Sequence, residues 1–437
     1  MRIVRFSIYG LYGVFDHEVE LKLDERVTII HGPNGYGKTT LLRLVHTVCG
    51  GDLSEVARTP FQTFVIGFDD GRRLEIERPP TMEPGGSCRL KLMLDKHIIA
   101  TADAPLDSLN RSHEEIRQRF PFLALVGEDV WEDTTDGEVL TTDEIYRRFP
   151  SVHQKPKLEK IEWFVNLVQP LNVKIIETGR LIRPTEVGPG VQRRRQSGRS
   201  TPLSVKGYAS DLSRRIKATL ADYAEKSQRL DQTFPIRLLD KSRFPTEELS
   251  GDRITDRIEE LERKRARLKD AGLLEREEHQ ATLPQVIDGS LQGVLAMYLQ
   301  DVEEKLTGFD DILEKIEVLQ QILNEHFSYK RLRISKDEGF SIYTYQGQPL
   351  DVTRLSSGEQ HLLVMLYELL FTDRPNSLIL IDEPEISLHV EWQIAFLGDL
   401  QRIAKIASHD VVIATHSPQI VNDRLDLMVP FLSSRNA

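Results

Sequence analysis

The chain has 437 residues and a mass of 50.1 kDa, with 40% hydrophobic and 29% charged residues. This composition is typical of a folded globular protein and excludes a disordered or fibrous chain. No apolar run approaches the roughly 20 residues of a membrane helix, and the N-terminus lacks the apolar core of a secretory signal. Two cysteines, Cys49 and Cys88, are too few for a disulfide framework or a four-cysteine zinc site. We therefore expect a cytoplasmic protein without a membrane partner.

The net charge of −11 is unevenly distributed along the chain. Residues 151–270 hold 26 Lys and Arg against 17 Asp and Glu, a local net charge of +9, which leaves −20 for the remainder. Such asymmetry favours an anionic or acidic partner of the middle segment. A set of ordinary solvated helix faces explains the same numbers, and both readings remain open.

The first half of the chain reads mostly as β-strands. Alternating and short buried apolar runs predict strands within residues 2–31, followed by a glycine-rich turn and a helix from about 38 to 48. Further strands are expected across 62–100, and one more at 172–177. Residues 126–145 are acidic and turn-rich, and we expect a solvated loop there rather than a metal site.

The middle of the chain reads first as a loop and then as helices. Residues 184–202, with the basic run Arg193–Arg199, lack apolar periodicity and predict a mobile basic loop. Residues 207–328 are mostly helical in pattern, with a second helical stretch from 291 to 326. Strand alternation returns at 331–335 and 340–345. One apolar stripe predicts an exposed amphipathic helix or short coiled coil, and its members are Ile254, Ile258, Leu261 and Leu268.

The run GPNGYGKT at residues 32–39 matches a phosphate-binding loop in full. Its glycines would let backbone N–H groups surround a polyphosphate, and the helix N-terminus would add partial positive charge. Lys38 would reach the β- and γ-phosphates, and the hydroxyl of Thr39 would bind Mg²⁺. We predict ATP and Mg²⁺ as ligands of the loop residues Gly32, Pro33, Asn34, Gly35, Tyr36, Gly37, Lys38, Thr39 and Thr40.

The run LILIDEP at 378–384 predicts a buried strand that ends in two carboxylates. Asp382 would hold the Mg²⁺ shell, and Glu383 would orient and deprotonate the attacking water. By itself the pattern also fits a strand followed by an acidic turn. Its occurrence together with the phosphate loop favours the catalytic interpretation.

The run LSSGEQ at 355–360 predicts the start of a helix over 358–371, with Ser357 and Gln360 as its capping box. Because a capped helix N-terminus can also bind phosphate, Ser357, Gly358 and Glu359 are candidate nucleotide contacts. The structural and the functional interpretation are compatible.

The run VVIATHSP at 411–418 predicts a strand that ends at His416, with Ser417 and Pro418 opening a helix. A single histidine at a strand end is usually structural. His416, however, follows Glu383 by about one helix and one strand. We therefore expect both at the same edge of the sheet, where His416 would hydrogen-bond the γ-phosphate.

In this order, the four motifs resemble an ABC-type ATPase head. The wide gap between Lys38 and Leu355 is similar to that of the RecF, SMC and OLD branch, and residues 385–389 resemble its EPE-x-x-LH segment. The resemblance implies an α/β P-loop head interrupted by a helical, short coiled-coil insertion. The implied divisions are an N-terminal lobe at 1–182, the basic loop and insertion at 183–328, and a C-terminal lobe at 329–437.

Two further segments, 175–181 and 227–238, are similar to stand-alone AAA-type ATPases of bacterial anti-phage systems such as the PARIS, Septu and retron-linked families. Two departures from the family pattern stand out. Residues 11–13 read Leu-Tyr-Gly where members often carry Phe-Arg-Gly. A Q-loop glutamine is also missing, because the matching strand end offers Glu177 or Thr178, and Gln62 lies earlier.

The resemblance also implies a shared site. In a head-to-tail dimer or higher oligomer, Lys38 and Thr39 of one subunit would face Ser357 and Gly358 of another across ATP. OLD nucleases continue into a TOPRIM domain after the position of His416, whereas here only residues 417–437 follow. We therefore expect a separate effector chain, a nuclease or toxin.

Three functions remain open on the sequence. The first is the sensor ATPase of a multi-chain anti-phage system. The second is a RecF-like repair or recombination ATPase that clamps DNA, which the basic middle segment favours. The third is an ATP-gated scaffold with little turnover, against which Glu383 argues.

Overall fold

The computed structural model describes residues 1–79, 86–95, 97–106, 116–117, 120, 122–126, 130–134, 139–141, 145, 161–177, 205–239, 251–274, 289–372, 374 and 376–431. By packing, the chain forms two compact units, residues 1–202 with 372–437, and residues 203–371. Residues 329–371, which the sequence analysis assigned to the C-terminal lobe, pack in the second unit with the helices. The basic run Arg193–Arg199 and Thr178 lie outside the described residues.

The first unit contains a six-stranded antiparallel sheet in the order β2-β1-β4-β5-β6-β7. The strands predicted near the N-terminus and across 62–100 are found here. Alternate residues point into the core, as in β5, where Leu74 and Ile76 are buried. The strands are β1 (Ile3–Leu11), β2 (Phe15–Glu20), β4 (Thr63–Phe68), β5 (Arg72–Glu77), β6 (Ser87–Leu94) and β7 (His97–Pro105).

A second sheet of the first unit has five parallel strands in the order β11-β15-β16-β3-β17. They are β3 (Val27–His31), β11 (Val173–Glu177), β15 (Leu378–Asp382), β16 (Asp410–Thr415) and β17 (Met428–Pro430). Strands β3, β15 and β16 are buried almost throughout, as expected for parallel strands covered on both faces. In register, Asp382 lies opposite Ala414, and Thr415 lies opposite His31. The carboxyl ends of these three strands therefore meet at one edge.

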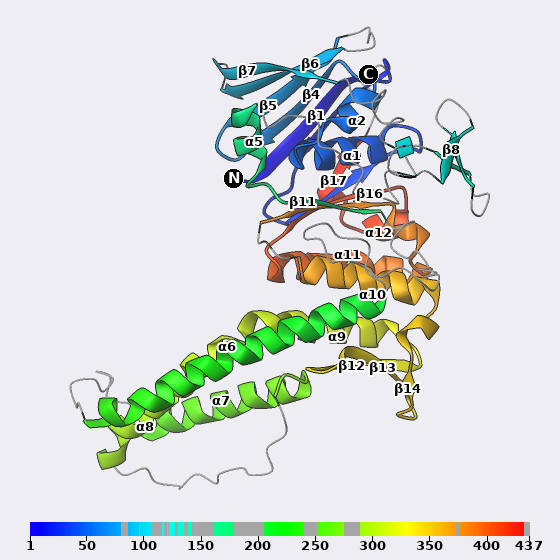
Figure 1. Ribbon diagram of the computed structural model, residues 1–437. Helices are drawn as coiled ribbons and strands as arrows, with labels where there is room; N and C mark the ends of the chain where they lie inside the picture. Colours follow the sequence, from blue (N-terminus) through cyan, green and yellow to red (C-terminus); the bar gives the residue numbers. More distant parts are fainter. Residues whose placement is uncertain are drawn as a thin grey trace. The chain divides into compact units, whose positions relative to one another are not determined.

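Helix α1 (Lys38–Cys49) lies between the two sheets, and α11 (Val390–Ile406) lies beyond the parallel sheet on its other side (Figure 1). One core cluster joins the buried face of α1 to both sheets, and it includes Phe6, Phe64, Leu41, Leu44, Leu380 and Val412. This packing fixes the start of α1 at the edge where the parallel strands end. Cys49 and Cys88 are buried free thiols.

Smaller elements complete the first unit. A separate sheet in the order β10-β9-β8 carries Trp131, which is fully buried beside Ile116, Leu123 and Ile145. The prediction of a solvated loop across 126–145 is therefore wrong for its described part, because the apolar surface of Trp131 organises strands there. The elements are β8 (Leu123–Leu125), β9 (Val130–Asp133), β10 (Val139–Thr141), α2 (Ser54–Arg58), α5 (Glu162–Val168), α12 (Pro418–Val421) and short 3₁₀ turns at Pro384–Ile386 and Leu425–Leu427.

The second unit begins with long helices, of which α6, α7 and α8 run side by side (Figure 1). They are α6 (Val205–Leu239), α7 (Gly251–Asp270), α8 (Gly289–Thr307) and α9 (Asp310–His326). The predicted stripe on α7 is confirmed, since Ile254, Leu261 and Leu268 are buried and Ile258 is half-buried. The helical stretch predicted at 291–326 is confirmed, and it consists of two helices that separate around Gly308. Among the described residues, no helix combines the length and the hydropathy that a membrane span requires.

The second unit ends with a small antiparallel sheet and a helix. Strands β12 (Lys330–Ser335), β13 (Gly339–Thr344) and β14 (Pro349–Leu350) pair in sequence order, which confirms the strands predicted here. After a 3₁₀ turn at Val352–Arg354, helix α10 (Ser357–Leu370) packs against α6 and α9. Two sheets packed around α1, with helices inserted between the chain's two ends, confirm the predicted α/β class with a helical insertion.

Candidate functional site

The phosphate loop lies between β3 and α1, as the motif predicts. Gly35 and Gly37 have φ of +83° and +87°, a conformation that favours glycine. At Gly37 a Cβ would also approach Cδ2 of the buried Leu11 to 2.4 Å. The loop thus requires glycine at this position for two independent reasons.

Lys38 is 5% exposed, and its Nζ donates to the carbonyls of Gly32 at 2.6 Å and Pro33 at 2.9 Å. Burial lowers the pKa of Lys38, while the carboxylates of Glu383, Asp382 and Glu385 act in the opposite direction. The ammonium group therefore faces the loop interior as a positive charge with little solvent around it.

Thr39 and Asp382 join the loop to the end of β15. The Thr39 hydroxyl donates to Asp382 Oδ1 at 3.1 Å, across 343 positions of sequence. Burial raises the pKa of Asp382, the charge of Glu383 adds to this rise, and the hydrogen bond from Thr39 opposes it. A hydroxyl and a carboxylate oxygen are ligands that Mg²⁺ prefers, with phosphate oxygens and water completing its shell. This donor pair fits Mg²⁺, although no cluster of three or more metal-binding side chains occurs in the described residues.

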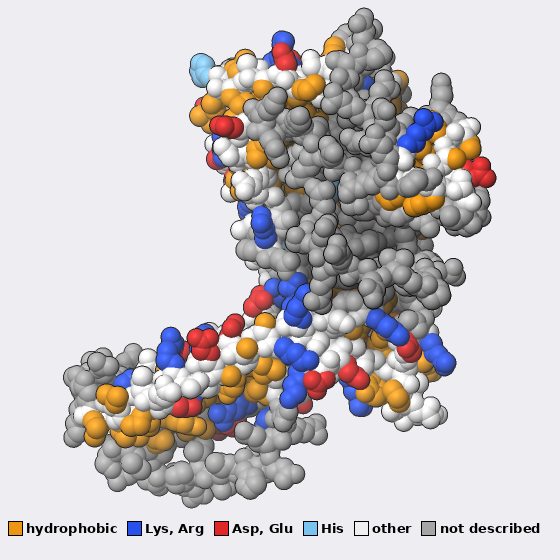
Figure 2. Space-filling view, in the orientation of Figure 1, with side chains coloured by type: hydrophobic (Ala, Val, Ile, Leu, Met, Phe, Trp, Pro, Cys, Tyr) orange, Lys and Arg blue, Asp and Glu red, His pale blue; other side chains and the backbone are white. Residues whose placement is uncertain are grey.

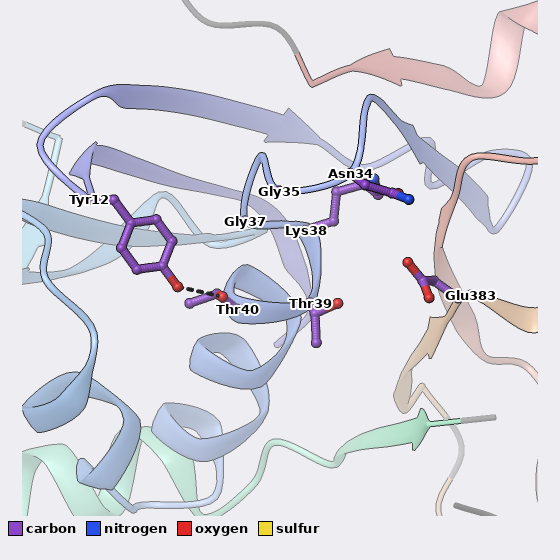
Figure 3. Close-up of a pocket in the computed structure, with 8 residues that line it drawn as sticks. All are labelled: Tyr12, Asn34, Gly35, Gly37, Lys38, Thr39, Thr40 and Glu383. Carbon is purple, nitrogen blue, oxygen red and sulfur yellow. Dashed lines mark hydrogen bonds between the residues drawn. The ribbon is translucent and has the colours of Figure 1, made fainter. Parts of the chain in front are cut away.

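Glu383 follows directly in a left-handed backbone conformation, with φ of +47°. A non-glycine residue rarely adopts this conformation, and such strain concentrates at functional sites. The Glu383 N–H donates to the carbonyl of Ala414 at 2.9 Å, which ties the turn to β16. The turn points the carboxylate toward the loop (Figure 3).

Residues of the phosphate loop and Glu383 line one pocket of about 210 Å³, and Asp382 adjoins it through its hydrogen bond from Thr39. Figure 3 shows Tyr12 on one side of the phosphate loop and Glu383 on the other. The lining residues are Tyr12, Asn34, Gly35, Gly37, Lys38, Thr39, Thr40 and Glu383. Of the predicted loop contacts, Gly32 and Pro33 contribute carbonyls to Lys38, and Tyr36 packs its ring against Phe15 instead of lining the pocket.

Tyr12 is a site residue that the motif analysis did not assign. Its hydroxyl hydrogen-bonds the hydroxyl of Thr40 at 2.9 Å, and its backbone φ is +53°. The residue occupies the middle of the Leu-Tyr-Gly departure, which was the available signal. An exposed aromatic ring at the pocket rim offers a flat surface to a planar ligand group.

His416 follows β16 at the same sheet edge, as predicted, and a buried carboxylate holds it. Glu385 Oε1 accepts from the Thr415 hydroxyl at 2.8 Å and the His416 N–H at 2.9 Å, and lies 3.0 Å from His416 Nδ1. The Glu385 side chain is 8% exposed, against 45% for His416. Sequence reasoning placed Glu385 in a family segment without giving it this task, since the contact joins residues 30 positions apart.

The position expected for a Q-loop residue carries a salt bridge. Glu177 ends β11 opposite Asp382 of β15, and it accepts from Arg43 of α1 at 2.8 Å. An acidic residue in this place changes the local charge relative to a glutamine. The guanidinium of Arg43 balances this negative charge next to Asp382.

Ser357, Gly358 and Glu359 lie in the second unit, at the start of α10. The predicted cap is wrong by one residue. Ser356 is the N-cap, its Oγ accepting from Glu359 N at 3.3 Å while Glu359 Oε2 accepts from Ser356 N at 2.7 Å. Burial would raise the pKa of Glu359, but hydrogen bonds from Lys330 and Ser356 hold it below its usual value. Ser357 therefore has an exposed side chain without a capping duty.

Comparison with known families identifies the kind of domain. Residues 194–422 match a family described as "AAA domain, putative AbiEii toxin, Type IV TA system", and residues 5–83 match a second AAA domain family. Because the first match covers more than half of the chain, the chain belongs to this family of AAA domains. The AAA-type part of the predicted resemblance is confirmed.

Two known proteins share shorter segments with the chain. Protein ea59 of Escherichia phage lambda is 32% identical over 87 residues, or 20% of this chain and 17% of that protein. The DNA double-strand break repair Rad50 ATPase of Halobacterium salinarum is 26% identical over 127 residues, or 25% of this chain and 14% of that protein. The matches thus span less than a fifth of the length of either relative.

Solved SMC head domains align over nearly the whole chain at low similarity. An Smc head from Pyrococcus furiosus, bound to the C-terminal domain of ScpA, has 12% identity and a TM-score of 0.34, covering 98% of this chain and 93% of that one. The SMC head domain from Thermotoga maritima has 10% identity and a TM-score of 0.34, covering 98% and 94%.

Proposed function

We propose that this AAA-domain protein binds ATP with Mg²⁺ in the pocket of the phosphate loop and hydrolyses it to ADP and phosphate. The observation that carries the proposal is the contact between Thr39 and Asp382. It brings the hydroxyl of the loop and a carboxylate of a distant strand to hydrogen-bonding distance, next to the pocket that Thr39, Lys38 and Glu383 line. This combination meets the requirements of a phosphoryl-transfer site.

Each side chain has a task that follows from its surroundings. Lys38 stabilises negative charge on the phosphates, and its burial strengthens that interaction. Thr39 and Asp382 would hold Mg²⁺, which would supply charge neutralisation and orientation of the phosphates when bound. Glu383 accepts a proton from the attacking water, and His416, held by Glu385, donates a hydrogen bond to the γ-phosphate. Catalysis on this view rests on positioning and electrostatics.

The test compares two variants of the pocket. Glu383→Gln keeps the shape of the side chain and removes its basicity. We expect it to bind ATP normally and to hydrolyse it at least about 100-fold more slowly. Lys38→Ala should lose ATP binding itself. Binding of a fluorescent ATP analogue and release of phosphate are measured separately, and wild-type turnover by Glu383→Gln would refute the assignment of the base.

We further propose that the ATPase is the sensor subunit of a multi-chain anti-phage system, acting on a separate nuclease or toxin. The family description, which names a putative toxin of a toxin–antitoxin system, and the similarity to a phage protein support this context. The test is purification of the tagged chain from its native host with ATP and Mg²⁺, followed by native mass spectrometry. A defined second chain is expected, and a homo-oligomer alone would contradict the proposal.

The second candidate is a RecF-like ATPase that clamps DNA. The segment shared with a DNA double-strand break repair ATPase favours it. This function predicts that duplex DNA stimulates ATP hydrolysis and that the stimulation falls steeply with salt. Turnover that duplex DNA leaves unchanged at low salt would exclude it.

A further inference from the structure

The small sheet β12-β13-β14 of the second unit has one buried and one exposed face. Leu332, Ile334, Phe340 and Ile342 are buried on one side, where α6 and α9 pack. Alternation therefore turns the neighbouring residues outward. The outward residues of β12 and β13 include two arginines and a tyrosine, and tyrosines also flank the hairpin on the same side, namely Tyr329, Arg331, Arg333, Tyr343 and Tyr345. We call these five residues the Tyr–Arg face.

Within this face, each arginine lies over a tyrosine ring. The guanidinium carbon of Arg331 is 4.6 Å from the ring centre of Tyr345, and that of Arg333 is 4.5 Å from the ring centre of Tyr343. Arg331 is paired with Tyr343 in the strand register, so the two contacts run along parallel diagonals of the hairpin. The Tyr345 hydroxyl accepts from Arg331 at 2.8 Å. Flat cationic and aromatic groups thus alternate on a regular framework.

The rings are accessible in this unit. Tyr329 is 78% exposed and Tyr345 is 58% exposed, and the two rings meet edge to face at 6.4 Å. Figure 2 shows basic and hydrophobic side chains next to one another over this sheet, with a few acidic ones among them. Adjoining exposed aromatic rings form a contiguous apolar patch, and such patches mark interaction sites more often than single exposed side chains do. The face therefore has stacking surface to offer to a partner.

The charges on the face have one sign. The strand residues facing outward, Arg331, Arg333, Ser335, Ser341 and Tyr343, include no carboxylate. The nearest acidic groups in sequence are Asp337 and Glu338, which lie in the turn at one end of the hairpin, and Asp337 pairs with Lys217. Lys330 points elsewhere and binds the carboxylate of Glu359. Arg333 has an exposed guanidinium whose described partner is the Tyr343 ring.

We propose that the Tyr–Arg face binds single-stranded nucleic acid, with bases stacked on the tyrosine rings and a phosphate held by Arg333, because the Arg331 guanidinium already donates to the carbonyl of Asn324 at 2.7 Å. Stacking platforms of exposed aromatics on a sheet, interleaved with arginine, are the chemistry by which such strands are bound without sequence readout. A duplex buries its base faces internally and cannot use the rings. The activity is separate from ATP hydrolysis, because the face contains none of the residues assigned to the ATP pocket.

The test measures fluorescence anisotropy of labelled oligonucleotides of about ten nucleotides with the full-length protein. A dT strand and an rU strand of equal length distinguish DNA from RNA. Tyr345→Ala should weaken binding about tenfold, since one stacked base is lost. Tyr345→Phe keeps the ring and should bind within about twofold of the wild type. Arg333→Ala should weaken binding about fivefold and reduce the salt slope by about 0.7.

Arg253→Ala on α7 is the control that matches the loss of charge, because Arg253 is exposed and lies outside the face. It should bind both strands like the wild type. The circular dichroism spectrum and the thermal unfolding midpoint, unchanged in every variant, show that each protein is folded, including the second unit that carries the substitutions. The proposal is overturned if neither strand binds at low salt, if Tyr345→Ala binds like the wild type, or if an equal length of duplex competes as well as a single strand.

Discussion

One oxygen atom of Glu385 holds both the end of β16 and the ring of His416. Oε1 accepts from Thr415 and His416, while Oε2 is buried with no hydrogen-bond partner among the described residues. Burying a carboxylate oxygen without a hydrogen bond costs free energy of folding. Such a cost is often found where the group serves a function. We infer that Glu385 is a positioning residue, which fixes the direction of a half-exposed imidazole.

Replacing Glu385 tests this inference at the level of one side chain. Glu385→Ala should lower kcat of ATP hydrolysis about 10- to 100-fold with little change in KM, because a misplaced catalytic group affects the transition state more than binding. Glu385→Gln keeps an acceptor at the Oε1 position and should restore most of the rate. The two variants are compared by steady-state kinetics, and equal kcat values for Glu385→Ala and the wild type would contradict the role.

The N-terminus of α10 is set by a single capping residue. Ser356, and not Ser357, exchanges hydrogen bonds with Glu359. Ser356→Ala should therefore cost about 1 kcal/mol of unfolding free energy, the usual value for an N-cap. Ser357→Ala is the matched control and should change stability by less than about 0.3 kcal/mol, since its exposed side chain makes no capping bond. Urea unfolding of both variants separates the two serines, and equal losses would contradict the assignment.

The elements that were predictable from the sequence are those whose pattern lies within a short stretch of residues. Strands β3, β15 and β16 are short apolar runs, and the phosphate loop is a fixed pattern of glycines between a strand and a helix. The N-cap of α10 was misplaced because Ser356 and Ser357 are both good capping residues. The choice between them depends on Lys330 of strand β12, which binds the carboxylate of Glu359. The buried Trp131 was likewise hidden by acidic neighbours in sequence.

At the scale of the whole chain, the basic middle segment finds its counter-charges further along the sequence. Arg237 of α6 binds the buried Asp301 of α8 through two hydrogen bonds of 2.7 and 2.6 Å. Arg257 and Arg267 of α7 pair with Glu303 and Glu317. The local charge of +9 is thus partly neutralised by acidic residues of α8 and α9. In the described helices these basic side chains form ion pairs within the second unit. Sequence alone left this alternative open, because the pairs join positions 46 to 64 residues apart.

The last prediction concerns how two chains would complete one ATP site. Lys38 belongs to the first compact unit and Ser357 to the second. If the site is shared head to tail, Lys38→Ala and Ser357→Arg chains should each be inactive alone. Ser357 is exposed, so its substitution leaves the core intact.

A mixture of the two variants distinguishes a shared site from one built within a single chain. In a head-to-tail dimer, the mixed pair combines an intact Lys38 with an intact Ser357 at one of its two sites. Random mixing in equal amounts should then restore about a quarter of wild-type hydrolysis, since half of the dimers are mixed and half of their sites are whole. A site completed within one chain gives no recovery. Phosphate release is measured as the ratio of the two variants in the mixture is varied.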